Sequence, residues 1–219
     1  MEDTIKKIHE LTLTKETANI LLALELAKNL TTPIQLDLRD VDLSNTDLSG
    51  ANLSGAILHY AILQDTNLSG ANLSKTLMNS ANFHQADLSG ADLSEADLYD
   101  ATIDYANLSG ANLSKAILKE ANLMESNFSN ANLMEAELIK ADLTYANLSG
   151  ANLKKAVLRG ADLANSNLSG ADLSEAVLYD AYLYKANLSE ANLSNAHLED
   201  ADLYDANLKD AIKTGTILE

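Results

Sequence analysis

Apolar and polar positions recur along residues 36–210 with a period of five. The stretch divides into 35 consecutive pentapeptides without an insertion, and ANLSG at residues 51–55 is representative. Leu stands third in 31 of these units and Ala stands first in 28, while the exceptions at the third position are Met78, Phe83, Ile103 and Phe128, all apolar. Neither a helix nor a long strand keeps every fifth residue on one side. The pattern therefore predicts a solenoid in which each unit is a very short strand followed by a corner.

A second period, of 20 residues, predicts the size of one coil. Glycine recurs at positions 50, 70, 90, 110, 150 and 170, with Asn130 in the gap. Four units therefore make one coil, and coils should stack as parallel strands about 4.8 Å apart. Gly and Asn tolerate a positive φ, so we expect this column to be a stack of identical turns. The expected fold is an all-β solenoid of about nine coils, with Leu and Ala side chains filling a square interior.

The run of A-[DN]-L-x-x units, such as ANLSG, ADLSE and ANLKK, resembles the pentapeptide repeat family over about four fifths of the chain. The resemblance implies a right-handed quadrilateral β-helix. It constrains function less, because members of the family bind partners of many kinds. Since such proteins are abundant in cyanobacteria, the resemblance also implies a bacterial source.

Residues 1–33 have a different pattern, which predicts two helices. The first should begin at Asp3 or Thr4, and the second should run from about Lys15 to Asn29, with a break at 12–14 and an end before Pro33. Their apolar sides would carry Ile5, Ile8 and Leu11 in the first helix and Ile20, Leu21, Leu22, Leu24, Leu26, Ala27 and Leu30 in the second. An open solenoid end exposes core and unpaired backbone, so we interpret residues 1–33 as a helical cap on a β-helix of residues 34–219. A helical docking or dimerisation element is the alternative.

The C-terminal end departs from the repeat in another way. Lys213 falls on a position that should hold a buried Leu, so we expect the regular coil to end near Asp210 or Ala211. Ile212, Ile217 and Leu218 would then fold over the last coil. The family resemblance implies that members often dimerise through this end, and we expect a homodimer.

Composition restricts the partners and the compartment. The chain has 219 residues, 47% apolar content, no Cys and a formal net charge of -17. Bare nucleic acid is not an expected partner, because phosphate binding needs clustered Lys and Arg. The first residues lack the apolar core of a signal peptide, and no stretch reaches the roughly 18 apolar residues of a membrane span. We expect a cytoplasmic protein that does not bind membranes.

Two of the four outer faces have nearly the same sequence in every unit. The glycine face comprises the units that begin at residue 46 and every 20 residues thereafter, and the lysine–glutamate face comprises those that begin at residue 51 in the same way. Their second positions are mostly Asn, which can form hydrogen bonds from coil to coil. The last position of the lysine–glutamate face alternates in charge: Lys75, Glu95, Lys115, Glu135, Lys155 and Glu175. We interpret both faces as structural, with a solvated ladder of ion pairs on the second.

The other two faces hold all eight tyrosines and form the candidate interaction surface. On the apolar face, whose units begin at residue 36 and every 20 residues thereafter, apolar residues replace Asn or Asp at the second position: Ile57, Leu77, Ile117, Val157 and Val177. The tyrosine face has units beginning at residue 41 and every 20 residues thereafter. The tyrosines assigned to the surface are Tyr99, Tyr179, Tyr182, Tyr184 and Tyr204. Such residues are typical of a protein interface, although aromatic and β-branched columns can also simply stabilise a sheet.

The sequence predicts a binding protein and not an enzyme. A packed rod without loops offers no concave pocket, and the three histidines of the repeat region, His59, His84 and His197, fall in three different columns. We therefore expect no catalytic residues, no metal and no cofactor. The leading hypothesis is a protein-binding or regulatory module with a protein partner that the sequence does not identify. The resemblance also suggests a DNA mimic that occupies the DNA-binding region of a type II topoisomerase such as gyrase, and a flat array of Asn, Ser and Gly raises a third hypothesis, ice binding.

Overall fold

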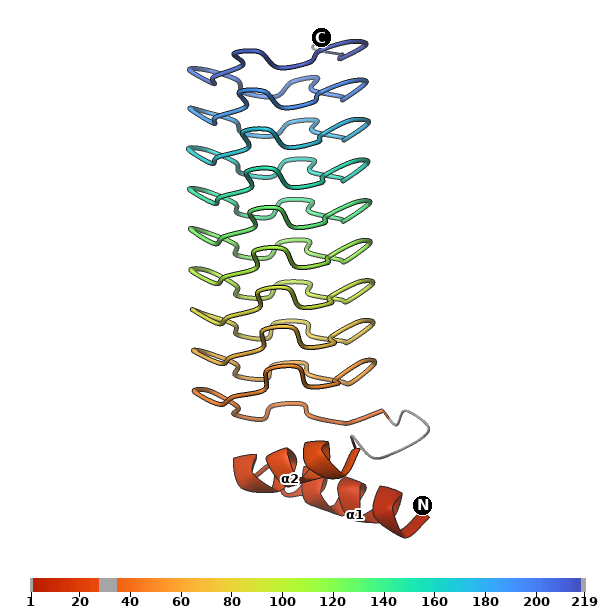
Figure 1. Ribbon diagram of the computed structural model, residues 1–219. Coiled ribbons are helices and arrows are strands. Elements are labelled where there is room, and N and C mark those ends of the chain that lie inside the picture. The colour runs from red at the N-terminus through yellow and green to blue at the C-terminus, as the bar shows by residue number, and fades with distance from the viewer. Residues whose placement is uncertain (1, 28–34, 218–219) are drawn as a thin grey trace.

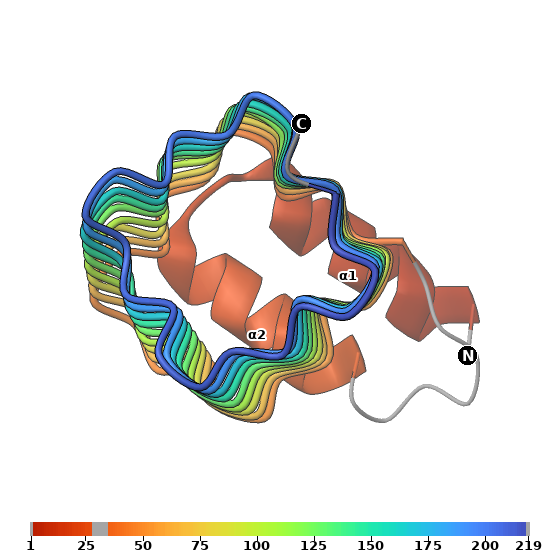
Figure 2. The ribbon, with the colours of Figure 1, turned by 90° about the horizontal axis from the view of Figure 1, so that it is seen from above.

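The computed structural model describes residues 2–27 and 35–217 as a rod of stacked coils with two helices beneath its N-terminal end (Figure 1). Helix α1 spans Glu2–Leu13 and helix α2 spans Thr17–Ala27. Viewed along its axis, the rod has a four-sided outline with protruding corners, and each coil lies almost directly over the one before (Figure 2). The helices lie across the open end of the first coil.

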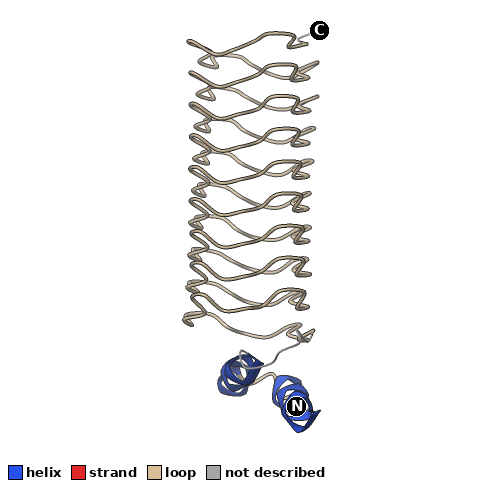
Figure 3. Cartoon of the chain, turned by 45° about the vertical axis from the view of Figure 1, so that its right-hand side comes forward, coloured by secondary structure: helices blue, strands red, loops and turns tan. Residues whose placement is uncertain are grey.

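Parallel backbone bridges confirm the 20-residue coil. They join the second residue of each unit to the residue 20 positions later, from the pair Asp37 and Ile57 to the pair His197 and Ile217. Each is an isolated bridge, so the whole described rod is drawn as loop in Figure 3. The expected short strands are therefore reduced to one bridging residue per unit, because a corner follows too soon for a longer ladder.

Almost every backbone N–H within a unit has a defined acceptor. In the unit 71–75, the first N–H closes a turn onto the carbonyl of Leu68 at 3.0 Å, and the second donates to Ala51 in the coil before at 2.8 Å. The third and fifth donate to Asp92 and Ser94 in the coil after, at 2.7 and 2.9 Å. Buried backbone N–H groups need hydrogen-bond acceptors, and the coils before and after supply most of them.

The fourth N–H is satisfied by the side chain at the second position. Ser74 N–H donates to Asn72 Oδ1 at 3.0 Å, and Ala164 N–H donates to Asp162 Oδ1 at 2.9 Å. This is the hydrogen bond of an Asx turn. Asn and Asp at this position thus hold the corner as well as linking coils, a role that the sequence analysis did not assign to them.

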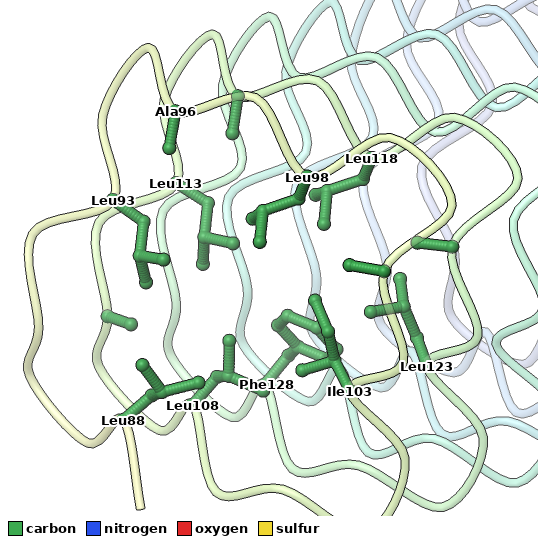
Figure 4. Packing of buried hydrophobic residues seen from close by; sticks show 14 of the residues in the cluster. Leu88, Leu93, Ala96, Leu98, Ile103, Leu108, Leu113, Leu118, Leu123 and Phe128 are labelled. Atoms are coloured by element: carbon green, nitrogen blue, oxygen red, sulfur yellow. The ribbon is translucent and has the colours of Figure 1, made fainter. Parts of the chain in front are cut away.

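Leu and Ala fill the interior as predicted. Third-position and first-position side chains from all four sides point inward and meet at the centre of the rod (Figure 4). Phe83 and Phe128 replace Leu and are fully buried. Where Thr or Ser replaces Ala, the hydroxyl donates to a carbonyl, as Thr66 Oγ1 does to Leu43 at 2.8 Å, so that a buried polar atom keeps a partner.

Every fifth position adopts a left-handed backbone, not only the glycine column. The prediction of identical turns is confirmed for that column, where Gly70 has a φ of 63° and Asn130 a φ of 56°. Lys75 and Glu95, on another face, have values of 59° and 58°. The conformation is therefore imposed by the coil geometry on residues that rarely adopt it, which sequence propensity does not reveal.

The two helices pack on the first coil. Thr17 Oγ1 donates to the carbonyl of Asp42 at 2.7 Å, the Lys15 ammonium donates to the carbonyl of Arg39, and Ile20 and Leu24 are buried in the same apolar core as the coils. Helix α1 begins at Glu2, slightly earlier than predicted. The break lies at 14–16 and not at 12–14, because Thr12 stays helical. The structure does not describe Asn29, Leu30 or Pro33, or the side chains of Leu26 and Ala27.

The prediction that the regular coil ends near Asp210 or Ala211 is wrong. Leu198 N–H still donates to the carbonyl of Ile217 at 2.8 Å. Ile212 and Ile217 do not fold over the last coil; they occupy outward second positions and are 52% and 43% exposed. Lys213 is tolerated because inward positions of this coil are not enclosed. Leu218 lies outside the described residues.

Candidate interaction surface

The apolar column is broken into three parts. Bridges join Ile57 to Leu77 and Val157 to Val177, whereas Ile117 stands alone. Asp97 and Glu137 separate these groups in the same column. All five apolar side chains point outward, and most are half-buried. The column therefore offers two small apolar pairs and a single residue, not the continuous stripe that an extended groove-binding partner would need.

The last coils bring three tyrosines together on the tyrosine face, at the blue end of the rod in Figure 1. The rings of Tyr184 and Tyr204 stack with centroids 5.9 Å apart and planes 5° from parallel. The ammonium of Lys185 lies 4.9 Å from the centroid of the Tyr184 ring, within the range of a cation–π interaction. Tyr204 is 68% exposed and Tyr182 is 55% exposed, so both present most of a ring to solvent.

Tyr179 lies on the adjoining face and is engaged within the chain. Its hydroxyl lies 3.0 Å from Nδ1 of His197, which in turn lies 3.3 Å from Oε1 of Glu199. Burial, and then the negative charge of Glu199, raise the pKa of Tyr179. Glu199 Oε2 is buried and has no hydrogen-bond partner in the described part of the chain. Tyr179 is thus half-buried in a small polar cluster and is a less open anchor than Tyr182 or Tyr204.

Tyr99 lies four coils away from Tyr179 and does not join the C-terminal group. Its hydroxyl donates to Glu120 Oε2 at 3.3 Å, and the charge of Glu120 raises the pKa of Tyr99. A similar arrangement that the sequence analysis did not assign joins His84 to Asp104, with Nδ1 and Oδ1 2.9 Å apart. The signal for such pairs is a spacing near 20 residues between a carboxylate and a polar side chain.

The two remaining faces have the expected structural interactions. Asn127 Nδ2 donates to Asn107 Oδ1 at 3.2 Å, one step of the amide column on the glycine face. On the lysine–glutamate face, ion pairs join residues one coil apart: Lys75 and Glu95 at 3.8 Å, Lys115 and Glu135 at 3.9 Å, and Lys155 and Glu175 at 3.5 Å. Neighbouring charges of the column therefore pair two by two.

A depression on the corner between the apolar and tyrosine faces was not predicted. It has a volume of about 380 Å³ and is lined by Ile139, Lys140, Arg159, Gly160, Asp180 and Tyr182. The available signal was Gly160, the one glycine in its column of fifth positions.

The described residues hold no group of three or more His, Asp or Glu side chains placed to bind a metal ion. Neither α1 nor α2 is long and apolar enough to cross a membrane.

Pentapeptide repeats match the chain in eight copies that together extend from residue 37 to residue 218. The chain belongs to the pentapeptide repeat family. The crystal structure of HetL, from the cyanobacterium Nostoc sp. strain PCC 7120, is similar with a TM-score of 0.71 and 35% identity, over 92% of this chain and 97% of that chain. A trypsin-treated form of QnrB1, a plasmid-mediated fluoroquinolone resistance protein, is similar with a TM-score of 0.76 and 19% identity, over 83% of this chain and 91% of that chain.

These structures establish the right-handed quadrilateral β-helix that the repeat pattern predicted. The identity to QnrB1 is low enough that the likeness concerns the fold alone. No curated protein matches the chain.

Proposed function

We propose that this chain is a non-enzymatic, protein-binding regulatory module that acts through the tyrosine-rich faces of its rod. The observation that carries the proposal is the group of Tyr182, Tyr184 and Tyr204 beside Lys185 on consecutive coils. Exposed aromatic rings held on a rigid scaffold lose little entropy on binding and often supply most of an interface's energy. The stacked pair of Tyr184 and Tyr204, in which the Tyr204 ring is mostly exposed, supports the proposal that a partner binds at this surface.

The likeness to HetL supports a regulatory role. HetL is described as a pentapeptide repeat protein involved in the regulation of heterocyst differentiation, and it shares 35% of its residues with this chain over most of both lengths. A bacterial, cytoplasmic setting with a protein partner, and without direct binding to nucleic acid or membranes, belongs to the same proposal.

The two ends of the rod have separate proposed roles. Residues 1–33 act as a cap, since Ile20 and Leu24 of α2 cover the core of the first coil. At the other end, apolar side chains of the last coils are only half-buried: Ala201, Leu203, Ala206, Leu208 and Ala211. A homodimer through this end would cover them, and sedimentation at several concentrations tests that assembly directly.

Affinity capture tests the main proposal. The full chain is immobilised and exposed to a lysate of the native host, in parallel with Tyr184→Ser/Tyr204→Ser and with a control, Ser94→Ala/Ser114→Ala, on the lysine–glutamate face. We expect a partner that the wild type and the control retain and that the tyrosine variant loses. Equal retention by all three proteins would refute a binding role for the tyrosine-rich face.

A second candidate is a DNA mimic that binds a type II topoisomerase such as gyrase. The net charge of -17 favours it, as does the direct stacking of Asp142 and Asp162 on the tyrosine face. A supercoiling assay with added protein separates the candidates, because a mimic must inhibit the enzyme or protect it from inhibitors. No effect at micromolar protein would remove this candidate.

A further inference from the structure

The depression at Gly160 combines open space with a distinct set of side chains. Its six lining residues come from two neighbouring faces: five from the corner of the apolar face and Tyr182 from the tyrosine face. Ile139 is half-buried and Tyr182 is largely exposed, so the space has an apolar side as well as charged groups. A partner side chain can enter it without any movement of the rod.

The backbone does not require glycine at position 160. Lys140 and Asp180, directly before and after Gly160 in the same column, adopt φ values of 57° and 58°, close to the 64° of Gly160. A Cβ at Gly160 would meet Lys140 Cγ at 3.7 Å, which is an ordinary contact. The effect of the glycine is therefore steric. Because position 160 has no side chain, the corner between Lys140 and Asp180 stays open.

Two cations beside this opening have no ion-pair partner among the residues that the structure describes. Of the Lys and Arg residues between positions 35 and 200, the others are each within 4.0 Å of a carboxylate or lie over an aromatic ring, as Arg39, Lys119 and Lys185 do. Lys140 and Arg159 make no such contact with any described residue. On a chain with a net charge of -17, two neighbouring cations without an ion pair among the described residues stand out from the acidic surface around them.

The backbone at Arg159 adds a further free donor. Its unit has Val157 at the second position, so the side-chain acceptor that Asn or Asp supplies to the fourth N–H in other units is missing. No hydrogen bond from the Arg159 N–H is formed within the described residues. The guanidinium, the ammonium of Lys140 and this N–H are all donors, and a carboxylate is an acceptor that can bind a guanidinium with two parallel hydrogen bonds.

We propose that the depression binds an acidic segment of the protein partner, with an Asp or Glu carboxylate against Arg159 and Lys140 and an adjacent apolar side chain against Ile139 and Tyr182. This inference rests on the proposed binding function and specifies the chemistry of the partner. Asp180 lines the far side of the space and disfavours a second carboxylate there. The site thus selects a single acidic residue with an apolar neighbour and not a polyanion.

A selection from a phage-displayed library of random short peptides tests the proposal on the full chain. Enriched peptides are then titrated by fluorescence polarisation against the wild type and three variants. Arg159→Glu reverses one cation. Gly160→Gln fills the space without a change of charge, and Gln85 already occupies a fifth position with a φ of 57°. Lys213→Glu is the control, because Lys213 is also an exposed cation with no ion pair among the described residues.

The expected result is enrichment of peptides that contain Asp or Glu beside an apolar residue, with affinity reduced at least about tenfold by Arg159→Glu and by Gly160→Gln. Lys213→Glu should leave the affinity within about twofold, and its melting temperature and that of Arg159→Glu should match the wild type. Gly160→Gln should stay folded with a slightly lower melting temperature, because a side chain at a φ of 64° is strained. Selected peptides without acidic residues, or equal affinity for Arg159→Glu, would overturn the inference, as would a failure to enrich any binder.

Two other outcomes would assign the site to a different occupant and would equally overturn the inference. Inorganic phosphate that binds the wild type but not Arg159→Glu, without acidic peptides, would indicate a phosphate-bearing ligand. A dimer in sedimentation that Arg159→Glu abolishes would indicate a second copy of this chain. Peptides that bind but are lost only on Tyr184→Ser/Tyr204→Ser would leave the proposed function standing and this site wrong.

Discussion

Tyr184 and Tyr204 stack face to face across one coil, with ring centroids 5.9 Å apart and planes 5° from parallel. The two residues occupy the same outward position in units 20 residues apart, so the parallel register of the rod fixes the overlap of their rings. Lys185 lies over Tyr184, and Tyr204 remains 68% exposed. The stack is therefore an interaction within the rod that still leaves the Tyr204 ring open to solvent.

A double-mutant cycle on this pair measures how much the stack contributes to folding. We expect Tyr184→Ser and Tyr204→Ser each to lower the free energy of unfolding by no more than about 1 kcal/mol, with a coupling of about 0.5–1 kcal/mol between them. The changes are mild because both side chains lie outside the core. Urea unfolding followed by circular dichroism provides the measurement. A loss of several kcal/mol would mean that the tyrosines mainly hold the sheet together.

The charge column on the lysine–glutamate face gives an independent prediction. Glu135 lies 3.9 Å from Lys115, and the next residue of the column, one coil further, is Lys155. Glu135→Lys replaces attraction with repulsion on both sides, and we expect a loss of about 0.5–1 kcal/mol in unfolding free energy at low salt. Added salt should reduce the loss, because exposed charges are screened.

Glu190→Lys is the matched control for this change. Glu190 has a φ of 61°, nearly the same as the 60° of Glu135, and it is also exposed at a fifth position. Its column neighbours are Gly170 and Asp210, so a lysine there has no like charge in its own column. Equal destabilisation by both changes at low salt would contradict an electrostatic origin and would point to the backbone instead.

The features that the sequence predicted well are those decided by which side of the chain is buried. Leu at the third position and Ala at the first recur in most units, so burial fixes the inward set, and the glycine column at every twentieth position fixes the coil. The ion pair of Lys75 and Glu95 and the amide contact of Asn107 and Asn127 follow from that coil, because residues 20 apart must lie one above the other.

The features that the sequence did not predict depend on backbone geometry or on the absence of a side chain. A left-handed φ at Lys75 or Glu95 contradicts local propensity, and it arises because stacking fixes the corner. The coil continues to Ile217 because backbone hydrogen bonds from the preceding coil do not depend on a Leu at Lys213. The depression lies where Gly160 lacks the side chain that Lys140 and Asp180 carry in the adjacent coils.

The corner conformation predicts a strong dependence on residue type at Gly70. Its φ is 63°, and a Cβ there would have no heavy atom within 4 Å, so any cost of substitution is conformational and not steric. Gly70→Val should lower the unfolding free energy by about 1–2 kcal/mol, because a β-branched residue disfavours the left-handed region. Gly70→Asn should cost clearly less, as Asn130 shows the same conformation in the same column. Thermal melts of the two variants compare them, and equal melting temperatures would show that the corner does not discriminate.

The packing of α2 on the first coil predicts that two residues of this helix differ in how much they stabilise the protein. Ile20 is fully buried, whereas Leu22 is 48% exposed. Ile20→Ala should cost about 2–4 kcal/mol by leaving a cavity, and Leu22→Ala less than about 1 kcal/mol. Loss of helical circular dichroism on heating measures both effects.

Deletion of residues 1–33 extends the same test to the whole cap. It should expose Leu36, Leu38 and Val41, which are buried in the full chain, and lead to association or a lower melting temperature. A truncated chain that stays monomeric and equally stable would refute the capping role of the helices.

The ion pair of Asp37 and Arg39 at the start of the rod predicts that the stability of the protein depends on pH. Arg39 Nε donates to Asp37 Oδ1 at 2.8 Å and Nη2 donates to Oδ2 at 2.5 Å, and these hydrogen bonds lower the pKa of Asp37 from 3.8 to about 2. A group with a lowered folded pKa stabilises the fold fully above its unfolded value, and this contribution is lost as the pH falls through about 2.

Asp37→Asn should therefore be less stable than the wild type near pH 5 by up to about 1 kcal/mol, since the pair is half-exposed and screened by solvent. The difference should shrink steadily as the pH falls through the interval between the unfolded pKa of 3.8 and the folded pKa of about 2. Asp97→Asn is the control, because Asp97 occupies the same column without a cation within 4.0 Å in the described structure. Urea unfolding at a series of pH values measures both variants. A difference for Asp37→Asn that stays constant across this range would show that the carboxylate charge of Asp37 does not contribute to folding.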